Sequence, residues 1–292
     1  SEQADQATIT QGYMGVVFEY GSEEDTIPVL SPENTQGLEF WITNKIREVR
    51  DRADDVKHKI GVLTGKDELK LTDTNLVPNQ RYSIRQIMEQ ALPFYKFEDV
   101  DLKDGATEIS KELDGLIVTQ PGKDFTDKEL RRIDQFLMLG NKSLAVFASA
   151  VNLKQGDASM KATLSTHGLE KLLAGYGVEM KKDAVLDWQR SLRLPVVLQM
   201  GIQWIREPAV LQVQHEPGLD ETQQPLDDSF PAFFRVQELA FPFPSTLVAH
   251  ADKQPGANVK VVARTTHAAW AESSDTVDLD RKSTRLNPSH RT

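Results

Sequence analysis

The feature that most constrains the fold is an alternation of short apolar runs with amphipathic helical segments between residues 58 and 186. Two of these helices begin with capping boxes, formed by Ser83 with Gln86 and by Thr126 with Glu129. This alternation predicts an α/β domain: a mostly parallel sheet with helices on both faces and right-handed crossovers. The predicted strands cover 58–63, 94–102, 113–119, 143–148 and 178–186.

A separate N-terminal region is predicted over residues 1–56. Gly15 to Tyr20 and Thr26 to Leu30 flank a polar turn, a pattern typical of a β-hairpin. An amphipathic helix should follow, because Ser31 is a good N-cap and Pro32 suits the first helical position. Apolar residues then recur at helical spacing, at Leu38, Trp41, Ile42, Ile46 and Val49.

The regular pattern weakens after residue 187. Prolines recur at positions 195, 208, 217 and 225, so we expect an irregular, Pro-rich insertion at about 188–232 inside an α/β domain of residues 57–274. Residues 275–292 lack apolar periodicity and end in a basic stretch, which predicts a disordered tail. A non-native translated linker is the favoured reading of that stretch, and a basic arm for a partner is the alternative.

Composition excludes several classes of function. The net charge of −10 disfavours binding to nucleic acid and broad contact with anionic lipid. The chain has no cysteine, which excludes disulfides, thiolate metal sites and a cysteine nucleophile. No apolar run is long enough to span a bilayer and no signal peptide is recognisable, so we expect membrane contact only through segments missing from this chain.

The sequence offers no convincing catalytic or metal-binding motif. The loop from Gly61 to Asp67 is one residue too short for a P-loop, and Asp67 replaces the hydroxyl that would bind magnesium. Ser149 follows a strand, but alanines flank it where a nucleophile elbow has glycine. The six histidines are scattered without metal-ligand spacing. We therefore predict no catalytic residue, metal or cofactor, although a pair of carboxylates brought together in space stays open.

The best place for a ligand is given by the geometry of open α/β sheets, whose ligands gather beyond the carboxyl ends of the strands. Small and polar loop residues follow three of the predicted strands. The alternative is that they form only turns. The candidate binding cleft comprises Thr64, Gly65, Lys66, Asp67, Thr119, Gln120, Gly122, Ser149 and Asn152.

Several segments along most of the chain together carry a resemblance to a known family. These segments are 30–39, 59–65, 114–122, 132–140, 168–173, 176–178, 185–187, 241–245 and 264–270. Taken in order, they are similar to the auxiliary, gliding-motility-type components of uncharacterised ABC transport systems, and the likeness covers about residues 12–272. No single motif is diagnostic, whereas the order and spacing are fairly specific.

The resemblance implies a membrane-anchored protein with a large domain on the periplasmic, extracytoplasmic side of the inner membrane. Its partners would be an ABC permease and its ATPase. The α/β part would be similar to the class I glutamine-amidotransferase fold, whose active members use a cysteine that this chain lacks. We therefore expect no enzymatic activity, but a non-catalytic interaction or ligand-sensing domain whose possible small ligand is unknown. The alternatives are a hydrolase-like enzyme using strand-end residues such as Ser149 and a solute receptor for a sugar or peptide.

Overall fold

The computed structural model describes residues 14–30, 37–74, 81–154, 159–198, 201–220, 223–233 and 236–279. The chain divides into two compact units, one of residues 1–57 with 229–235 and one of residues 58–228 with 236–292. The first division falls one residue from the predicted boundary at 56. Among the described residues, no helix is both long and apolar enough to cross a membrane.

The first unit contains the predicted hairpin and helix. Strands β1 (Val16–Tyr20) and β2 (Glu23–Ile27) pair antiparallel, and helix α1 spans Leu38–Ala53. Lys45 of α1 bonds to Asp25 of β2 at 3.0 Å, so the helix is tied to the hairpin. The expected caps Ser31 and Pro32 lie outside the described residues, and α1 begins after Gly37. The short helix η2 (Pro231–Phe233) also belongs to this unit.

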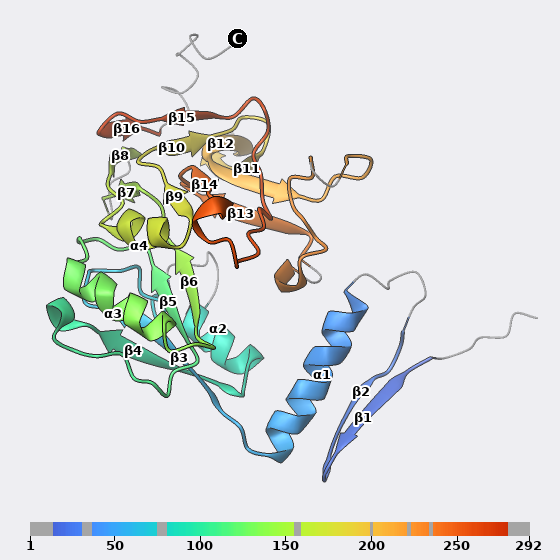
Figure 1. Ribbon diagram of the computed structural model, residues 1–292. Helices are drawn as coiled ribbons and strands as arrows, with labels where there is room; N and C mark the ends of the chain where they lie inside the picture. The colour runs from blue at the N-terminus through green and yellow to red at the C-terminus, as the bar shows by residue number, and fades with distance from the viewer. Residues whose placement is uncertain are drawn as a thin grey trace, which may run out of the picture. The chain divides into compact units, whose positions relative to one another are not determined.

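The second unit is built around a four-stranded parallel sheet of order β4-β3-β5-β6 (Figure 1). All three of its strand pairs are parallel, which confirms the α/β prediction for residues 58–147. The strands are β3 (His58–Thr64), β4 (Tyr95–Asp101), β5 (Gly115–Thr119) and β6 (Ser143–Phe147).

Helices cover both faces of this sheet. Helix α2 (Ile84–Ala91) follows β3, η1 (Lys103–Gly105) follows β4, α3 (Asp127–Leu137) follows β5, and α4 (Leu169–Gly175) lies further along the chain. Both predicted capping boxes are present. Arg85 of α2 bonds to Asp99 of β4, whereas the neighbouring Val100 packs into the core that contains α3. Since adjacent strand residues point to opposite faces, α2 and α3 lie on opposite sides.

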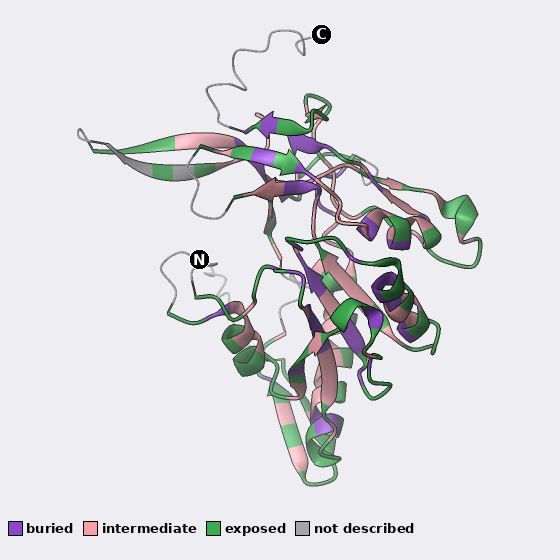
Figure 2. Cartoon of the chain, turned by 90° about the vertical axis from the view of Figure 1, so that its left-hand side faces the viewer, coloured by how far each residue is buried: buried purple, intermediate pink, exposed green. Residues whose placement is uncertain are grey.

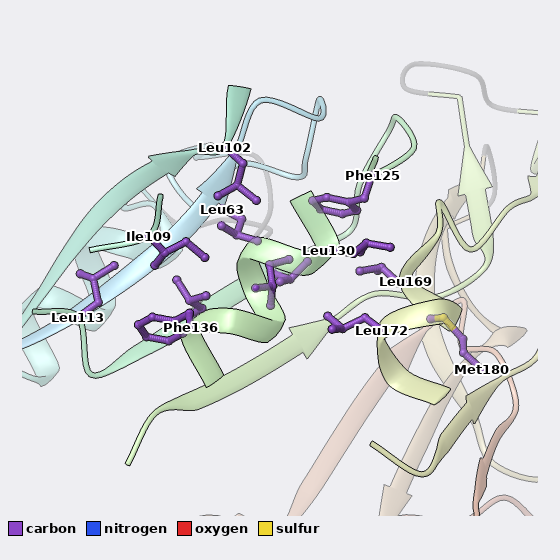
Figure 3. Packing of buried hydrophobic residues seen from close by; sticks show 13 residues of the cluster. Leu63, Leu102, Ile109, Leu113, Phe125, Leu130, Phe136, Leu169, Leu172 and Met180 are labelled. Carbon is purple, nitrogen blue, oxygen red and sulfur yellow. The ribbon is translucent and has the colours of Figure 1, made fainter. Parts of the chain in front are cut away.

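The main core lies between the sheet and the pair α3 and α4. Figure 3 shows Leu63 and Leu102 from the strands' side, Phe136 and Leu130 from α3, and Leu172 from α4 in one layer. Fully burying such side chains stabilises a fold by about 1.5–3 kcal/mol each. This layer therefore fixes the strand ends from which the loops of the candidate cleft depart.

The parallel sheet ends with β6, and the described strands that follow it pair antiparallel in smaller sheets. The predicted strand 178–186 is wrong as a single element. It forms two strands, β9 (Val178–Met180) and β10 (Ala184–Leu186), which pair antiparallel with β14 (Leu247–Ala249) and β15 (Trp270–Glu272). Lys181, Lys182 and Asp183 interrupt the apolar run. Asp183 Oδ1 also accepts a hydrogen bond from Thr246 N at 2.8 Å, a long-range contact that the local pattern does not encode.

The prediction of an irregular insertion is wrong for residues 191–214. Two long strands, β11 (Ser191–Leu198) and β12 (Gly201–Gln214), form an antiparallel sheet with β13 (Glu238–Pro242). Prolines are tolerated here for positional reasons. Pro195 lies on the edge strand β11, and Pro208 falls within a register shift where β12 has extra residues.

The predicted tail begins too early. Strand β16 (Thr276–Asp278) pairs antiparallel with β8 (Lys161–Leu164), which in turn pairs with β7 (Val151–Leu153). Val277 and Leu279 are buried in a second core with apolar residues of β7, β8 and β10. The local pattern missed this because the core is built from segments that are about 90 to 130 residues apart in sequence. Residues 280–292 lie outside the described residues, and η3 (Ala251–Lys253) precedes β15.

Candidate functional site

The loops that follow β3 and β5 are joined at the carboxyl edge of the parallel sheet. The backbone N–H of Leu69 donates to Gln120 O at 2.9 Å, and that of Gly122 donates to Lys66 O at 2.8 Å. The Thr119 hydroxyl donates to Leu69 O at 2.7 Å. These bonds use backbone groups that would otherwise be available to a ligand, and they hold the two loops against each other.

Lys66 connects the β3 loop to the start of α3. Its side chain is only 11% exposed, and Nζ lies 2.9 Å from carboxylate oxygens of both Asp104 and Glu129. Glu129 is also the capping-box residue that accepts from Thr126 N at 2.8 Å. Burial disfavours the charged ammonium, but the hydrogen bonds to Asp104 and Glu129 outweigh it and raise the pKa of Lys66. The Lys66 ammonium is therefore held between two carboxylates.

The other candidates after β3 are Thr64, Gly65 and Asp67. Gly65 has φ of 103°, and a Cβ at this position would lie 2.6 Å from an oxygen of Asp101, so glycine is needed. Asp67 pairs with Lys123 at 2.8 Å, but both side chains are more than 60% exposed, and such surface pairs contribute little. Thr64 is half-buried at the end of β3.

A second group of candidates forms a hydrogen-bonded network beside the first. Gln120 Nε2 donates to Ser149 O at 3.1 Å and to Asn152 Oδ1 at 2.9 Å, while its Oε1 accepts from Ser149 N at 2.8 Å. Asn152 Nδ2 donates to the carbonyls of Ala150 and Ser165 at 3.0 and 2.9 Å. Gln120, Ser149 and Asn152 thus do meet, as the strand-end argument predicts, and they fix one another's amide orientations.

His167 and Asp124 complete this network and were not among the sequence candidates. His167 Nε2 lies 2.9 Å from Asn152 Oδ1, and its Nδ1 lies 2.8 Å from Asp124 Oδ1. The histidine has φ of 51°, in the left-handed region that is costly for a residue with a Cβ. Its pairing with Asp124, across 43 residues, leaves no local sequence signal.

This histidine–carboxylate pair differs from that of a hydrolase. A catalytic histidine would present its second nitrogen to a nucleophilic hydroxyl. Here that nitrogen faces the Asn152 amide oxygen, and Ser149 Oγ instead accepts from Val151 N at 3.1 Å. The arrangement orders the strand ends and offers no aligned nucleophile and base.

Glu68, in the loop after β3, has one carboxylate oxygen without a hydrogen-bond partner in the structure. Glu68 is 7% exposed and its Oε2 accepts from Lys66 N at 2.7 Å, while Oε1 is buried without a hydrogen-bond partner in the structure. Within the described ranges, no group of three or more histidine, aspartate or glutamate residues could hold a metal ion. Glu68 therefore has no neighbouring ligand set of that kind.

A shallow groove of about 320 Å³ lies elsewhere, between α3 and α4. Tyr176 at its side donates to Asp134 Oδ1 at 2.8 Å, and burial together with this bond raises the pKa of Tyr176 to about 12. Lys171 bonds Asp127 across the groove at 2.8 Å. None of the nine predicted cleft residues lines this groove.

Comparison with known proteins places the second unit in a family. No curated protein of similar sequence was found. A family model described as an ABC-type uncharacterized transport system, the auxiliary component, matches residues 57–291. That range covers the parallel sheet, the strand-end network and all of the C-terminal strands. The chain therefore belongs to the family of auxiliary components of ABC-type transport systems.

Proposed function

We propose that this chain is the extracytoplasmic contact domain of an auxiliary protein of an ABC-type transport system, and that it works by binding rather than by catalysis. The family match over residues 57–291 carries the transport assignment. The periplasmic location and the gliding-motility-type affiliation belong to the same proposal, as does the amidotransferase-like character of the parallel sheet.

The bonding state of the strand-end side chains supports a non-catalytic role. Three of the described side chains that could act as nucleophile, base or electrostatic stabiliser are engaged within the chain. Lys66 is held by two carboxylates, His167 by Asp124 and Asn152, and Ser149 accepts from a backbone N–H. Freeing any of them would cost a buried hydrogen bond, about 0.5–1.5 kcal/mol net and more for charged groups. An edge stabilised in this way is suited to hold a rigid binding surface.

The expected partners are the permease and ATPase of the same system. The test is to reconstitute the permease and ATPase of the same transport system in nanodiscs and to titrate in the full chain. We expect saturable binding by light-scattering or interferometry and a changed rate of ATP hydrolysis. An unrelated ABC permease in the same nanodiscs serves as the matched control. Equal binding to both complexes, or to neither, would contradict the proposal.

The non-catalytic part has its own experiment. A fluorophosphonate probe should label the wild-type chain no more than Ser149→Ala, because Ser149 Oγ lacks an activating histidine. Gel fluorescence after denaturation measures the labelling, and a known serine hydrolase is the positive control. Selective labelling that disappears in Ser149→Ala would establish the hydrolase alternative instead.

A further inference from the structure

The hairpin of β11 and β12 extends beyond the rest of its sheet as a two-stranded ribbon. Strand β13 pairs with Val210 to Gln214 of β12, so within the described part of the chain residues 201–206 have β11 as their sole strand partner. Figure 2 shows this ribbon reaching outward, with exposed residues in green towards its end. A two-stranded ribbon is at best marginally stable alone in water, which raises the question of what it contacts.

The sequence of the ribbon is apolar and uncharged. Between Arg193 and Arg206 no residue is Asp, Glu, Lys or Arg. Ile202 is 66% exposed and Trp204 is 65% exposed. Large apolar side chains grouped on a projecting element mark an interaction site or an aggregation hazard.

Two arginines stand opposite each other at the base of this apolar section. Arg193 and Arg206 are direct cross-strand partners, and Pro195 and Trp204 are the partners two positions further out on the same face. Arg206 donates to the carbonyls of Trp188 and Gln189 at 2.8 and 3.2 Å. Among the described residues neither arginine has an ion pair with a carboxylate, although like charges placed directly opposite destabilise a strand pair.

We propose that this ribbon, through Ile202, Trp204, Arg193 and Arg206, binds the interfacial zone of a phospholipid bilayer that contains anionic headgroups. Tryptophan and arginine next to apolar residues suit the boundary between headgroups and acyl chains. Each arginine near an anionic surface contributes attraction, and lipid phosphates would relieve the repulsion between the two cations.

Charge distribution favours this ribbon as the point of contact. The whole chain has a net charge of −10, whereas residues 193–206 of the ribbon contain two arginines and no acidic residue. An anionic surface would therefore repel the body of the protein and attract the ribbon. This adds a membrane contact within the chain to the one expected through missing segments.

The backbone limits how deeply the ribbon can enter. The outer edges of two paired strands carry unpaired N–H and C=O groups, which the hydrocarbon core does not tolerate. The ribbon accordingly lies in the hydrated interface. Lipid headgroups at a bilayer interface can surround both faces of the ribbon. A protein partner could do so only with a groove that encloses the ribbon from both sides.

The experiment is flotation of the full chain with protein-free vesicles of phosphatidylethanolamine and phosphatidylglycerol. We expect the wild type to float, and Ile202→Ser/Trp204→Ser to partition at least about tenfold less, since each buried apolar side chain is worth roughly a factor of ten. The matched control is Phe147→Ser/Leu247→Ser, which removes two similarly exposed apolar residues, 68% and 62%, from other strands. This control should float like the wild type.

The charge contribution is tested separately with Arg193→Gln. Compared with the wild type, we expect this variant to bind anionic vesicles several-fold more weakly and with a smaller dependence on salt concentration. The variant and the wild type should bind vesicles of phosphatidylcholine equally weakly. Circular dichroism verifies that each variant is folded. Equal flotation of wild type and Ile202→Ser/Trp204→Ser would overturn the proposal, as would binding only to permease-containing nanodiscs. Because the vesicles contain no protein, failure here leaves the ABC-partner proposal to its own test.

Discussion

At the scale of single residues, the second unit is defined by polar side chains that join distant elements. Hydrogen bonds of 2.9 Å connect Asn152 of β7 to Gln120 and His167, which lie in two separate loops. Lys66 joins the β3 loop to the capping carboxylate of α3. Tyr176 joins the end of α4 to Asp134 of α3. Each of these bonds can form only because packing has already placed its partner within bonding distance.

Tyr176 provides a pH-dependent prediction. Its pKa of about 12 exceeds the value of 10.0 in an unfolded chain, because burial and the bond to Asp134 disfavour the phenolate. A raised pKa contributes stability that is complete below pH 10 and lost as the pH rises from 10 to about 12. Urea unfolding should thus show the wild type losing stability over this window more steeply than Tyr176→Phe. Parallel curves for the two proteins would contradict the prediction.

At the scale of elements, helix caps can be predicted from neighbouring residues, whereas strand boundaries depend on partners far away in the sequence. The capping boxes at Ser83 and Thr126 were recognisable from four residues each, since the cap bonds only within its own first turn. Strands β9 and β10 could not be separated in this way, because their partners β14 and β15 lie some 70 to 90 residues away. The same holds for β11 and β12, where edge position and a register shift accommodate the prolines.

The ribbon of β11 and β12 has an apolar sequence but an exposed position. Its apolar composition is typical of a buried strand, yet Ile202 and Trp204 are about two-thirds exposed. Such a mismatch is expected at functional positions rather than within a folded core. The proposed membrane contact therefore lies on the ribbon and not at the strand-end network.

At the scale of the whole molecule, the second unit has two cores of different origin. The first is assembled from consecutive strand–helix segments between Leu63 and Met180. The second draws on Val151 to Leu186, on Ala209 and on the last described residues, Val277 and Leu279. Removal of the C-terminal strand should therefore affect the fold well beyond the chain end.

Deletion of residues 275–292 tests this. It removes the buried side chains of Val277 and Leu279, at about 1.5–3 kcal/mol each, so we expect a loss of roughly 3–6 kcal/mol in unfolding free energy. Deletion of residues 280–292 alone is the matched control and should leave stability within about 0.5 kcal/mol. Equal stability of the two truncated chains would refute a structural role for β16.

The sequence by itself determined the α/β order of residues 58–147, the hairpin at Val16 to Ile27 and the two capping boxes, because periodicity and caps act over a few residues. It also indicated that Gln120, Ser149 and Asn152 would meet, since parallel strands end at one edge. Tertiary structure alone decided that His167 and Asp124 join them, that hydrogen bonds connect the loops after β3 and β5, and that β16 completes a core. Those outcomes depend on contacts between segments far apart in sequence, and no local pattern contains them.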